Sequence, residues 1–97
     1  MGDFKKGQIG HSKIDTVYSG NIVVTIWEKE VNDSKVYYDI MIARQYFIEG
    51  TEDPMYSTKI QQRDFDDLIL AVTDARMRIR ELVWALRKRQ QSEYSEE

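Results

Sequence analysis

The hydrophobic period of the chain changes once, at Asp64, and this change limits the possible folds more than any other feature. Before Asp64, apolar and polar residues alternate in short segments separated by turn-forming residues, which is typical of β-strands. After Asp64, apolar residues recur at spacings of three and four, which is typical of an amphipathic helix. The alternating segments are residues 14–18, 21–30, 35–48 and 55–61, and the helical pattern covers residues 64–90. We therefore expect an α+β fold, a four-stranded antiparallel sheet followed by one long C-terminal helix (β-β-β-β-α).

The chain length of 97 residues predicts a single domain. The first twelve residues are mostly polar and contain three glycines, and the last seven contain three glutamates and no base. We expect a flexible N-terminal arm at residues 1–12, one domain at residues 13–90 and an acidic tail at residues 91–97.

The composition argues against several classes of function. The chain has no cysteine and a single histidine, His11, which excludes thiolate and multi-histidine metal sites. No apolar run approaches the roughly 18 residues needed to cross a bilayer. Most carboxylates fall in turns, at the helix start or in the tail, so no acid–base pair is expected to converge on a pocket. We expect a cytoplasmic protein that is not an enzyme, holds no metal or cofactor, and has neither a membrane nor a small molecule as its partner.

The predicted helix is longer than the predicted sheet is wide. Residues 64–90 would extend roughly 40 Å at 1.5 Å per residue, whereas four strands make a sheet about 19 Å wide. The second half of the helix would then leave apolar side chains uncovered, which is unfavourable in a monomer. A second copy could cover them, so we expect a homodimer whose interface contains Ile79, Leu82, Val83 and Leu86.

The net charge of −3 hides an uneven distribution of charge. Between Arg76 and Arg89 the chain has six bases and one acid, Glu81. This run has the composition of a phosphate-binding strip, and it also fits a solvated helix face or a helix that packs on the sheet. The solvated face is favoured over the phosphate-binding strip, and the length of the helix relative to the sheet favours packing over binding to a membrane surface or a calmodulin-type partner.

Strict alternation divides the predicted sheet into two faces. In the first strand, Ile14, Thr16 and Tyr18 alternate with Lys13, Asp15 and Val17. The face toward the helix would carry Ile22, Val24, Ile26, Tyr38, Ile40, Ile42 and Ile60. The other face would carry Val23, Thr25, Trp27, Lys29, Tyr37, Asp39, Met41, Gln45, Phe47, Ser57, Lys59 and Gln61. Aromatic rings interleaved with lysines on an uncovered β-surface favour binding of unstacked bases and their phosphates. The alternatives are that dimerisation buries this face or that its scattered aromatic residues are ordinary surface residues.

Three stretches between Ser19 and Leu86 form motifs, of which Ile26-Trp27-Glu28 and Arg44-x-Tyr46 are the distinctive parts. Residues 20–28 read Gly-Asn-Ile-Val-Val-Thr-Ile-Trp-Glu, and the next strand has Tyr38, Ile40, Ile42, Arg44 and Tyr46 at alternate positions. The third is Ile60-Gln-Gln-Arg-Asp-Phe65 with Leu68. Together these motifs resemble small prokaryotic proteins similar to the positive-cofactor-four transcription coactivator domain, whose general build is shared by Whirly and Pur-type nucleic-acid binders.

The resemblance implies a β-β-β-β-α unit, dimeric through its helices, whose curved sheet grips single-stranded DNA. It adds Arg44 and Tyr46 to the candidate binding residues. By strict alternation both fall on the helix-facing side, so either they project beyond the helix edge or a bulge switches their side. The acidic turn at residues 49–54 departs from what a binding rim would favour.

We therefore expect a protein that binds single-stranded DNA or RNA, with DNA favoured, and that takes part in transcription regulation. Bases would stack on the open sheet face, while Lys and Arg would neutralise phosphates. The expected binding residues are Trp27, Lys29, Tyr37, Arg44, Tyr46, Phe47 and Lys59. The alternative is a dimeric protein-interaction module that binds no nucleic acid.

Overall fold

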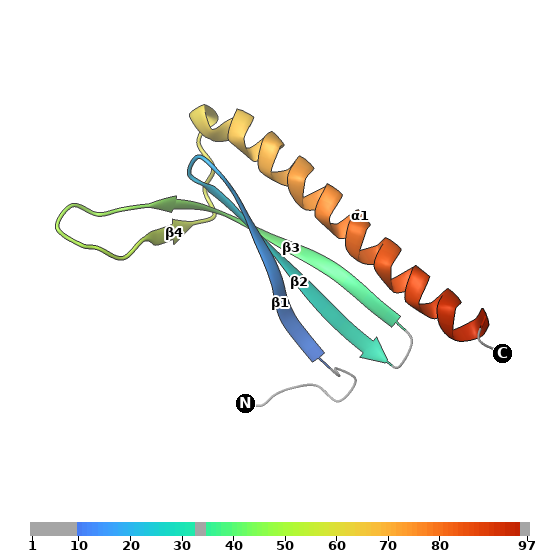
Figure 1. Ribbon diagram of the computed structural model, residues 1–97. Coiled ribbons are helices and arrows are strands. Elements are labelled where there is room, and N and C mark those ends of the chain that lie inside the picture. Colours follow the sequence, from blue (N-terminus) through green and yellow to red (C-terminus); the bar gives the residue numbers. More distant parts are fainter. Residues whose placement is uncertain (1–9, 33–34, 96–97) are drawn as a thin grey trace.

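A computed structural model describes residues 10–32 and 35–95, which form one sheet and one long helix (Figure 1). The strands are β1 (Gly10–Ser19), β2 (Ile22–Asn32), β3 (Lys35–Tyr46) and β4 (Met55–Ser57). A short 3-10 helix, η1 (Gln62–Asp64), leads directly into α1 (Phe65–Ser95). The strands pair antiparallel in the order β1-β2-β3-β4. The predicted fold, a four-stranded antiparallel sheet followed by one long C-terminal helix, is confirmed.

The element boundaries differ from the predicted ones at both ends of the domain. β1 begins at Gly10, because residues of the predicted arm pair with the long strand β2, and His11 lies opposite Lys29. α1 continues to Ser95, inside the predicted acidic tail, because no glycine or proline follows Pro54 to end it. Three segments lie outside the described residues. They are the rest of the predicted arm (residues 1–9), part of the turn between β2 and β3 (residues 33–34) and the end of the tail (residues 96–97).

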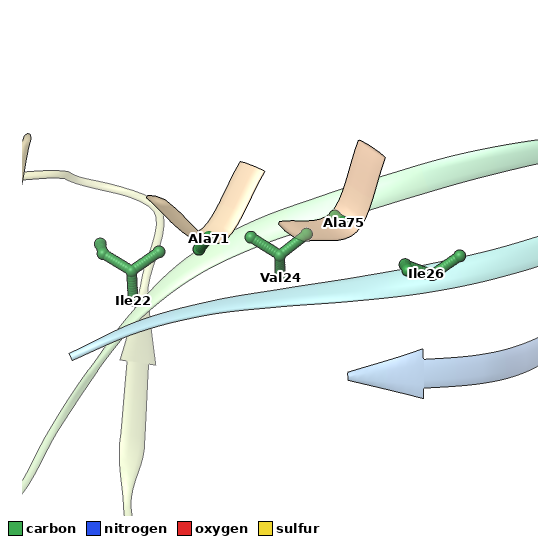
Figure 2. Packing of buried hydrophobic residues seen from close by; sticks show 5 residues of the cluster. All are labelled: Ile22, Val24, Ile26, Ala71 and Ala75. Atoms are coloured by element: carbon green, nitrogen blue, oxygen red, sulfur yellow. The ribbon is translucent and has the colours of Figure 1, made fainter. Parts of the chain in front are cut away.

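The core is formed where α1 crosses β2. Ile22, Val24 and Ile26 of β2 are fully buried, and they pack with Ala71 and Ala75 of α1. Figure 2 shows Ile22 and Val24 extending toward the helix turns that carry the two alanines. Small side chains on the helix allow it to approach the sheet closely. Full burial of an aliphatic side chain of this size contributes about 1.5–3 kcal/mol, so this contact is the main source of stability.

α1 is attached to β1 by polar contacts along its edge. The Ser19 hydroxyl donates to Oδ1 of Asp67 at 2.8 Å, and Nε of Arg78 donates to Oδ2 of Asp15 at 3.0 Å. The Asp15 carboxylate, assisted by Glu81, raises the pKa of the Arg78 guanidinium. The helix therefore lies along β1 and β2 and makes little contact with β3 or β4.

A β-bulge at Ile14 changes which side chains of β1 share a face. The pairing with β2 shifts between Lys13 and Asp15, so Ile14 is an extra residue in β1. Asp15 then lies opposite Ile26 on the helix side, and Ile14 packs against the core. Tyr18 lies opposite Val23, on the other side of the sheet. The sequence had placed Ile14 and Tyr18 on one face, and the bulge separates them.

Gly20 is expected to be essential for the β1–β2 turn. Its φ is +56°, and an added Cβ would meet the carboxylate of Asp67. Gly20→Ala should lower the free energy of unfolding by about 1–3 kcal/mol for the backbone alone, with a further loss because Asp67 must move away from Ser19. Urea unfolding followed by circular dichroism measures this loss.

Gly50→Ala is the matched control. Gly50 has a φ of +89°, but nothing lies within 4 Å of the position that a Cβ would occupy. This variant should therefore show the backbone loss only. Equal losses in the two variants would contradict the proposed crowding of Asp67.

Candidate nucleic-acid interface

The face of the sheet opposite α1, called the open face from here on, has no described element packed on it. Directly paired residues of an antiparallel sheet share a face, which assigns its side chains. Four rows cross β1, β2 and β3 in turn: His11–Lys29–Tyr37, Lys13–Trp27–Asp39, Thr16–Thr25–Met41 and Tyr18–Val23–Ala43. Lys35 follows the same alternation at the start of β3. The side chains of the open face are thus aromatic and basic at the end where β2 finishes, and most of those in its middle are small.

Trp27 is the largest side chain of the aromatic end, and it is half-buried. Its ring lies against that of His11, with centroids 4.9 Å apart and an interplanar angle of 36°. Tyr37, half exposed, lies one row away beside Lys29. Three rings and a lysine from three strands therefore meet here. His11 falls within the predicted flexible arm, and the longer β1 places it in this group instead.

The indole nitrogen of Trp27 is an unusual feature of this group. Nε1 is buried, and it has no hydrogen-bond partner among the described residues. An unpaired buried donor costs about 1–3 kcal/mol, so such groups are rare outside functional or strained places.

At the end of the sheet where β2 finishes, basic side chains of the strands lie mainly on the open face and acidic ones on the helix side. The open face carries Lys13, Lys29 and Lys35 against one acid, Asp39. Alternation puts Glu28 and Glu30 on the helix side, where the hydroxyl of Tyr38 donates to Oε2 of Glu28 at 3.1 Å. Although the net charge of the chain is −3, this end of the open face is locally positive, and the lysines lie among its aromatic rings.

A hollow of about 410 Å³ occupies the middle of the open face. Val23, Thr25 and Ala43 are small and form part of its lining, while Tyr18 and Tyr56 come from opposite edges of the sheet. Both tyrosines are more than half exposed. The remaining lining residues are Lys13, Thr16, Met41, Ile42, Ser57 and Thr58. The volume lies in the range of about 300–1,000 Å³ that suits small organic groups.

Arg44 and Tyr46 both lie on the helix side of the sheet, so no bulge switches their side, and the burial of Arg44 also excludes that it projects beyond the helix edge. Nε of Arg44 donates to Oδ2 of Asp64 at 2.6 Å, and the two residues are only 8% and 4% exposed. No bulge switches the strand here, because Arg44 pairs regularly with Ile22. Tyr46 follows on the same side, opposite Met55. Arg44 is therefore a buried partner of Asp64 and not a residue that phosphates can reach.

The other predicted binding residues are divided between the two sides. Trp27, Lys29 and Tyr37 lie together on the open face, as predicted. Ser57 lies opposite Arg44, which reverses its predicted side, and Lys59 and Gln61 line a helix-side hollow with Arg44 and Tyr46. Phe47 is exposed just beyond β3, eight residues and thus about 26 Å along the chain from Asp39 beside Trp27.

The four residues predicted for the dimer interface are already partly covered within one chain. Ile79 and Leu82 pack against the core, and Val83 and Leu86 are half-buried. The large apolar side chains that are exposed in the part of α1 with described side chains, residues 65–88, are Phe65, Ile69, Leu70, Met77 and Trp84.

Sequence reasoning missed five residues of the open face: His11, Lys13, Tyr18, Lys35 and Tyr56. Lys35 could have been found by extending the alternation of Tyr37 by two positions. Tyr18 depends on the bulge at Ile14, and Tyr56 depends on the register of β4, neither of which has a clear signal in the sequence.

Within residues 10–32 and 35–95, no cluster of three or more His, Asp or Glu side chains could hold a metal ion. Nor does that part of the chain contain a helix that is long and apolar enough to cross a membrane. No protein-family model, curated protein or solved structure matches the chain.

The Arg44–Asp64 pair should be a stability element. Asp64→Ala leaves a buried, unpaired guanidinium and should lower the free energy of unfolding by about 3–5 kcal/mol. Arg63→Ala, which removes an exposed charge from the same 3-10 helix, should change it by no more than about 0.5 kcal/mol. Urea unfolding of both variants makes the comparison, and similar losses would show that the buried pair is not needed.

Proposed function

We propose that this protein binds single-stranded nucleic acid on the open face, with single-stranded DNA as the expected strand. The observation that carries the proposal is the coincidence, on one uncovered face, of aromatic rings with three of the lysines. Trp27, Tyr37 and His11 offer flat surfaces, and Lys13, Lys29 and Lys35 lie among them. Every base has a π-face and every phosphate a charge, so this combination suits a single strand of any sequence.

Unpaired bases fit this surface better than a duplex does. The rings of the open face project from a sheet, and only bases that are free of a partner can lie against them. In a duplex the bases are stacked inside, and the lysines alone would act on the backbone. We therefore expect a clear preference for single strands.

The hollow between Tyr18 and Tyr56 offers a second place for a base. It lies four residues along β3 from the row of Trp27, which corresponds to about 13 Å. Lys13 is in the Trp27 row and also lines the hollow, so one phosphate near Lys13 would lie between the two positions. A strand bound to both would run along β2 and β3.

The unpaired Nε1 of Trp27 fits this proposal. A buried donor without an acceptor is retained at a cost, and a ligand oxygen that replaced the neighbouring His11 ring would provide an acceptor. The resemblance of residues 19–86 to the positive-cofactor-four family agrees with single-strand binding and extends the proposal to transcription regulation.

Stacking is tested with Trp27→Ala and Tyr56→Ala. Each should weaken binding by a factor of about 5 to 150, because stacking contributes about 1–3 kcal/mol per base. Tyr46→Ala removes a ring from the helix side of the same sheet and should leave the affinity unchanged. Fluorescence anisotropy of a labelled thymidine oligomer measures all four proteins, and circular dichroism confirms that the variants are folded.

Charge is tested by the salt dependence of the same titration. Lys29→Ala or Lys13→Ala should lower the slope of log K against log salt by about 0.7, the value for one phosphate of a single strand. Lys59→Ala should leave the slope unchanged, because Lys59 lies with Arg44 on the other side. An unchanged slope for Lys29→Ala and Lys13→Ala, with a lowered one for Lys59→Ala, would move the site to the helix side.

The alternative function, a protein-interaction module, has its own outcome. If low salt and tens of micromolar protein give no change in anisotropy with a thymidine oligomer or its RNA counterpart, the proposal fails. The open face would then have to serve a protein partner.

A further inference from the structure

The hollow of about 410 Å³ in the middle of the open face has two prominent walls and a shielded floor. Tyr18 and Tyr56 come from opposite edges of the sheet and are 63% and 56% exposed, whereas Val23 between them is 6% exposed. Ala43, directly opposite Val23, continues the floor on β3. Side chains larger than that of alanine are favoured in strands, so the small residue at this place leaves room for a ligand.

The hollow would contact a base differently from the aromatic end of the open face. A base on Trp27 or Tyr37 is contacted on its flat side, which is common to all bases. A base in the hollow is also contacted at its edge, because residues from all four strands line the hollow. The edge of a base carries the donors, acceptors and methyl group that distinguish it from the other bases. The hollow is therefore the part of the open face where a particular base can be selected.

Lys13 determines the polarity of the hollow. It is exposed, it lines the hollow, and no ion pair of the described residues engages it. An ammonium group offers three hydrogen-bond donors and no acceptor. Among the described residues that line the hollow, none has a carboxylate or an amide side chain, and the hydroxyls can act as donor or acceptor. A base in the hollow should therefore present an acceptor to Lys13.

The exocyclic groups of the bases separate them on this criterion. Adenine and cytosine carry an amino group on the edge that in thymine carries O4, so Lys13 would meet a second donor there. Guanine presents acceptors on that edge, but its N2 amino group finds no carboxylate or amide in the described lining. Thymine and uracil have carbonyl oxygens and no amino group. They are the bases that fit the hollow best.

The floor distinguishes thymine from uracil. Val23, Thr25 and Ala43 present aliphatic groups to the hollow, and alanine and threonine methyl groups are common contacts of the C5-methyl group of thymine. In thymine this methyl group and O4 are bound to neighbouring ring atoms. A thymine with its methyl group on the floor therefore has an acceptor close by for the lysine at the side of the hollow.

We propose that the hollow is a thymine-selective subsite of the single-strand interface. Lys13 donates from Nζ to O4 of the base, and the methyl group of the base contacts Val23 and Ala43. Tyr18 and Tyr56 flank the ring from the two edges of the sheet. This selectivity rests on the proposed binding of single strands to the open face. It also favours DNA over RNA, because RNA has uracil in place of thymine.

The first experiment compares labelled oligomers of thymidine, deoxyuridine and deoxycytidine, equal in length, by fluorescence anisotropy with the full chain. All three bases are pyrimidines, so stacking at Trp27 and phosphate contacts are similar. Thymidine should bind about fourfold more tightly than deoxyuridine, which is the effect of burying one methyl group. Deoxyuridine should bind more tightly than deoxycytidine by a factor of about five or more, because only cytosine turns an amino group toward Lys13.

Guanine is tested with deoxycytidine oligomers that carry one central thymine or one central guanine. The thymine oligomer should bind more tightly, because guanine lacks the methyl group and brings an amino group without a matching acceptor. Tighter binding of the guanine oligomer would overturn the choice of thymine.

Lys13→Met and Lys29→Met form a matched pair, because each removes one lysine of the open face and only Lys13 lines the hollow. Lys13→Met should bind the deoxyuridine and deoxycytidine oligomers with equal affinity. Lys29→Met should weaken the binding of every oligomer by the same factor and retain the order of affinities. An order that is retained in Lys13→Met and lost in Lys29→Met would overturn the role of Lys13.

Ala43→Leu and Gln45→Leu test the floor of the hollow. Both introduce a leucine on the open face of β3, but Gln45 lies opposite Tyr56 and is not part of the lining. Ala43→Leu should remove the preference for thymidine over deoxyuridine, because the leucine occupies the space of the methyl group. Gln45→Leu should retain this preference. Circular dichroism confirms that both variants are folded.

The outcomes separate the selectivity from the proposed function. Equal affinities of the wild type for the thymidine, deoxyuridine and deoxycytidine oligomers would overturn the selectivity and leave single-strand binding in place. No binding of any oligomer at low salt and tens of micromolar protein would overturn the proposed function, and the selectivity with it. A thymidine preference that persists in Ala43→Leu would overturn the assignment of the hollow.

Discussion

The alternation of side chains along β2 determines the arrangement of the rest of the molecule. Ile22, Val24 and Ile26 must be buried, and among the elements that the structure describes only α1 covers them. Once α1 packs on that side, Val23, Thr25 and Trp27 necessarily face the other way. A shift of one residue would exchange the two sets, so the core and the open face are specified by the same constraint. The position of Trp27 is thus a consequence of how β2 is buried.

The buried pair of Arg44 and Asp64 has a different effect on the structure. It joins the end of β3 to the 3-10 helix that precedes α1, and so it places the start of the helix relative to the sheet. Two charges are costly to bury and are tolerated only in good geometry, which restricts the chain to few arrangements at this point. The motif that suggested a phosphate contact for Arg44 therefore has an intramolecular explanation.

Most of the fold could be predicted from the sequence, because long periodic segments identify their own structure. The four strands and the helix follow from the change of period at Asp64. Side chains were assigned to the wrong face of the sheet where a shift of one residue reverses the alternation. The bulge at Ile14 moves Tyr18 to the open face, and the pairing of Ser57 with Arg44 moves Lys59 away from it. Register depends on contacts between strands, and alternation within one strand cannot reveal it.

The candidate site was predicted in part for the same reason. Trp27, Lys29 and Tyr37 lie on regular stretches of β2 and β3, where alternation is reliable. His11 and Tyr56 come from the start of β1 and from the three-residue strand β4, whose pairing partners decide their side. The part of the sheet that α1 covers could not be predicted from the sequence either, because it depends on the polar contacts of Asp67 and Arg78 with β1.

The separation of charge across the sheet has a consequence for how the molecule moves in solution. With Lys13, Lys29 and Lys35 on one side and Glu28 and Glu30 on the other, the strands carry a local dipole through the sheet at the end where β2 finishes, whatever the net charge of the chain. In the field of a polyanion such a body is turned before it makes contact, so collisions on the lysine side become more frequent than chance would give. The effect decays over a Debye length of about 8 Å at physiological ionic strength. An acidic protein of this kind can thus approach another acidic polymer in a preferred orientation.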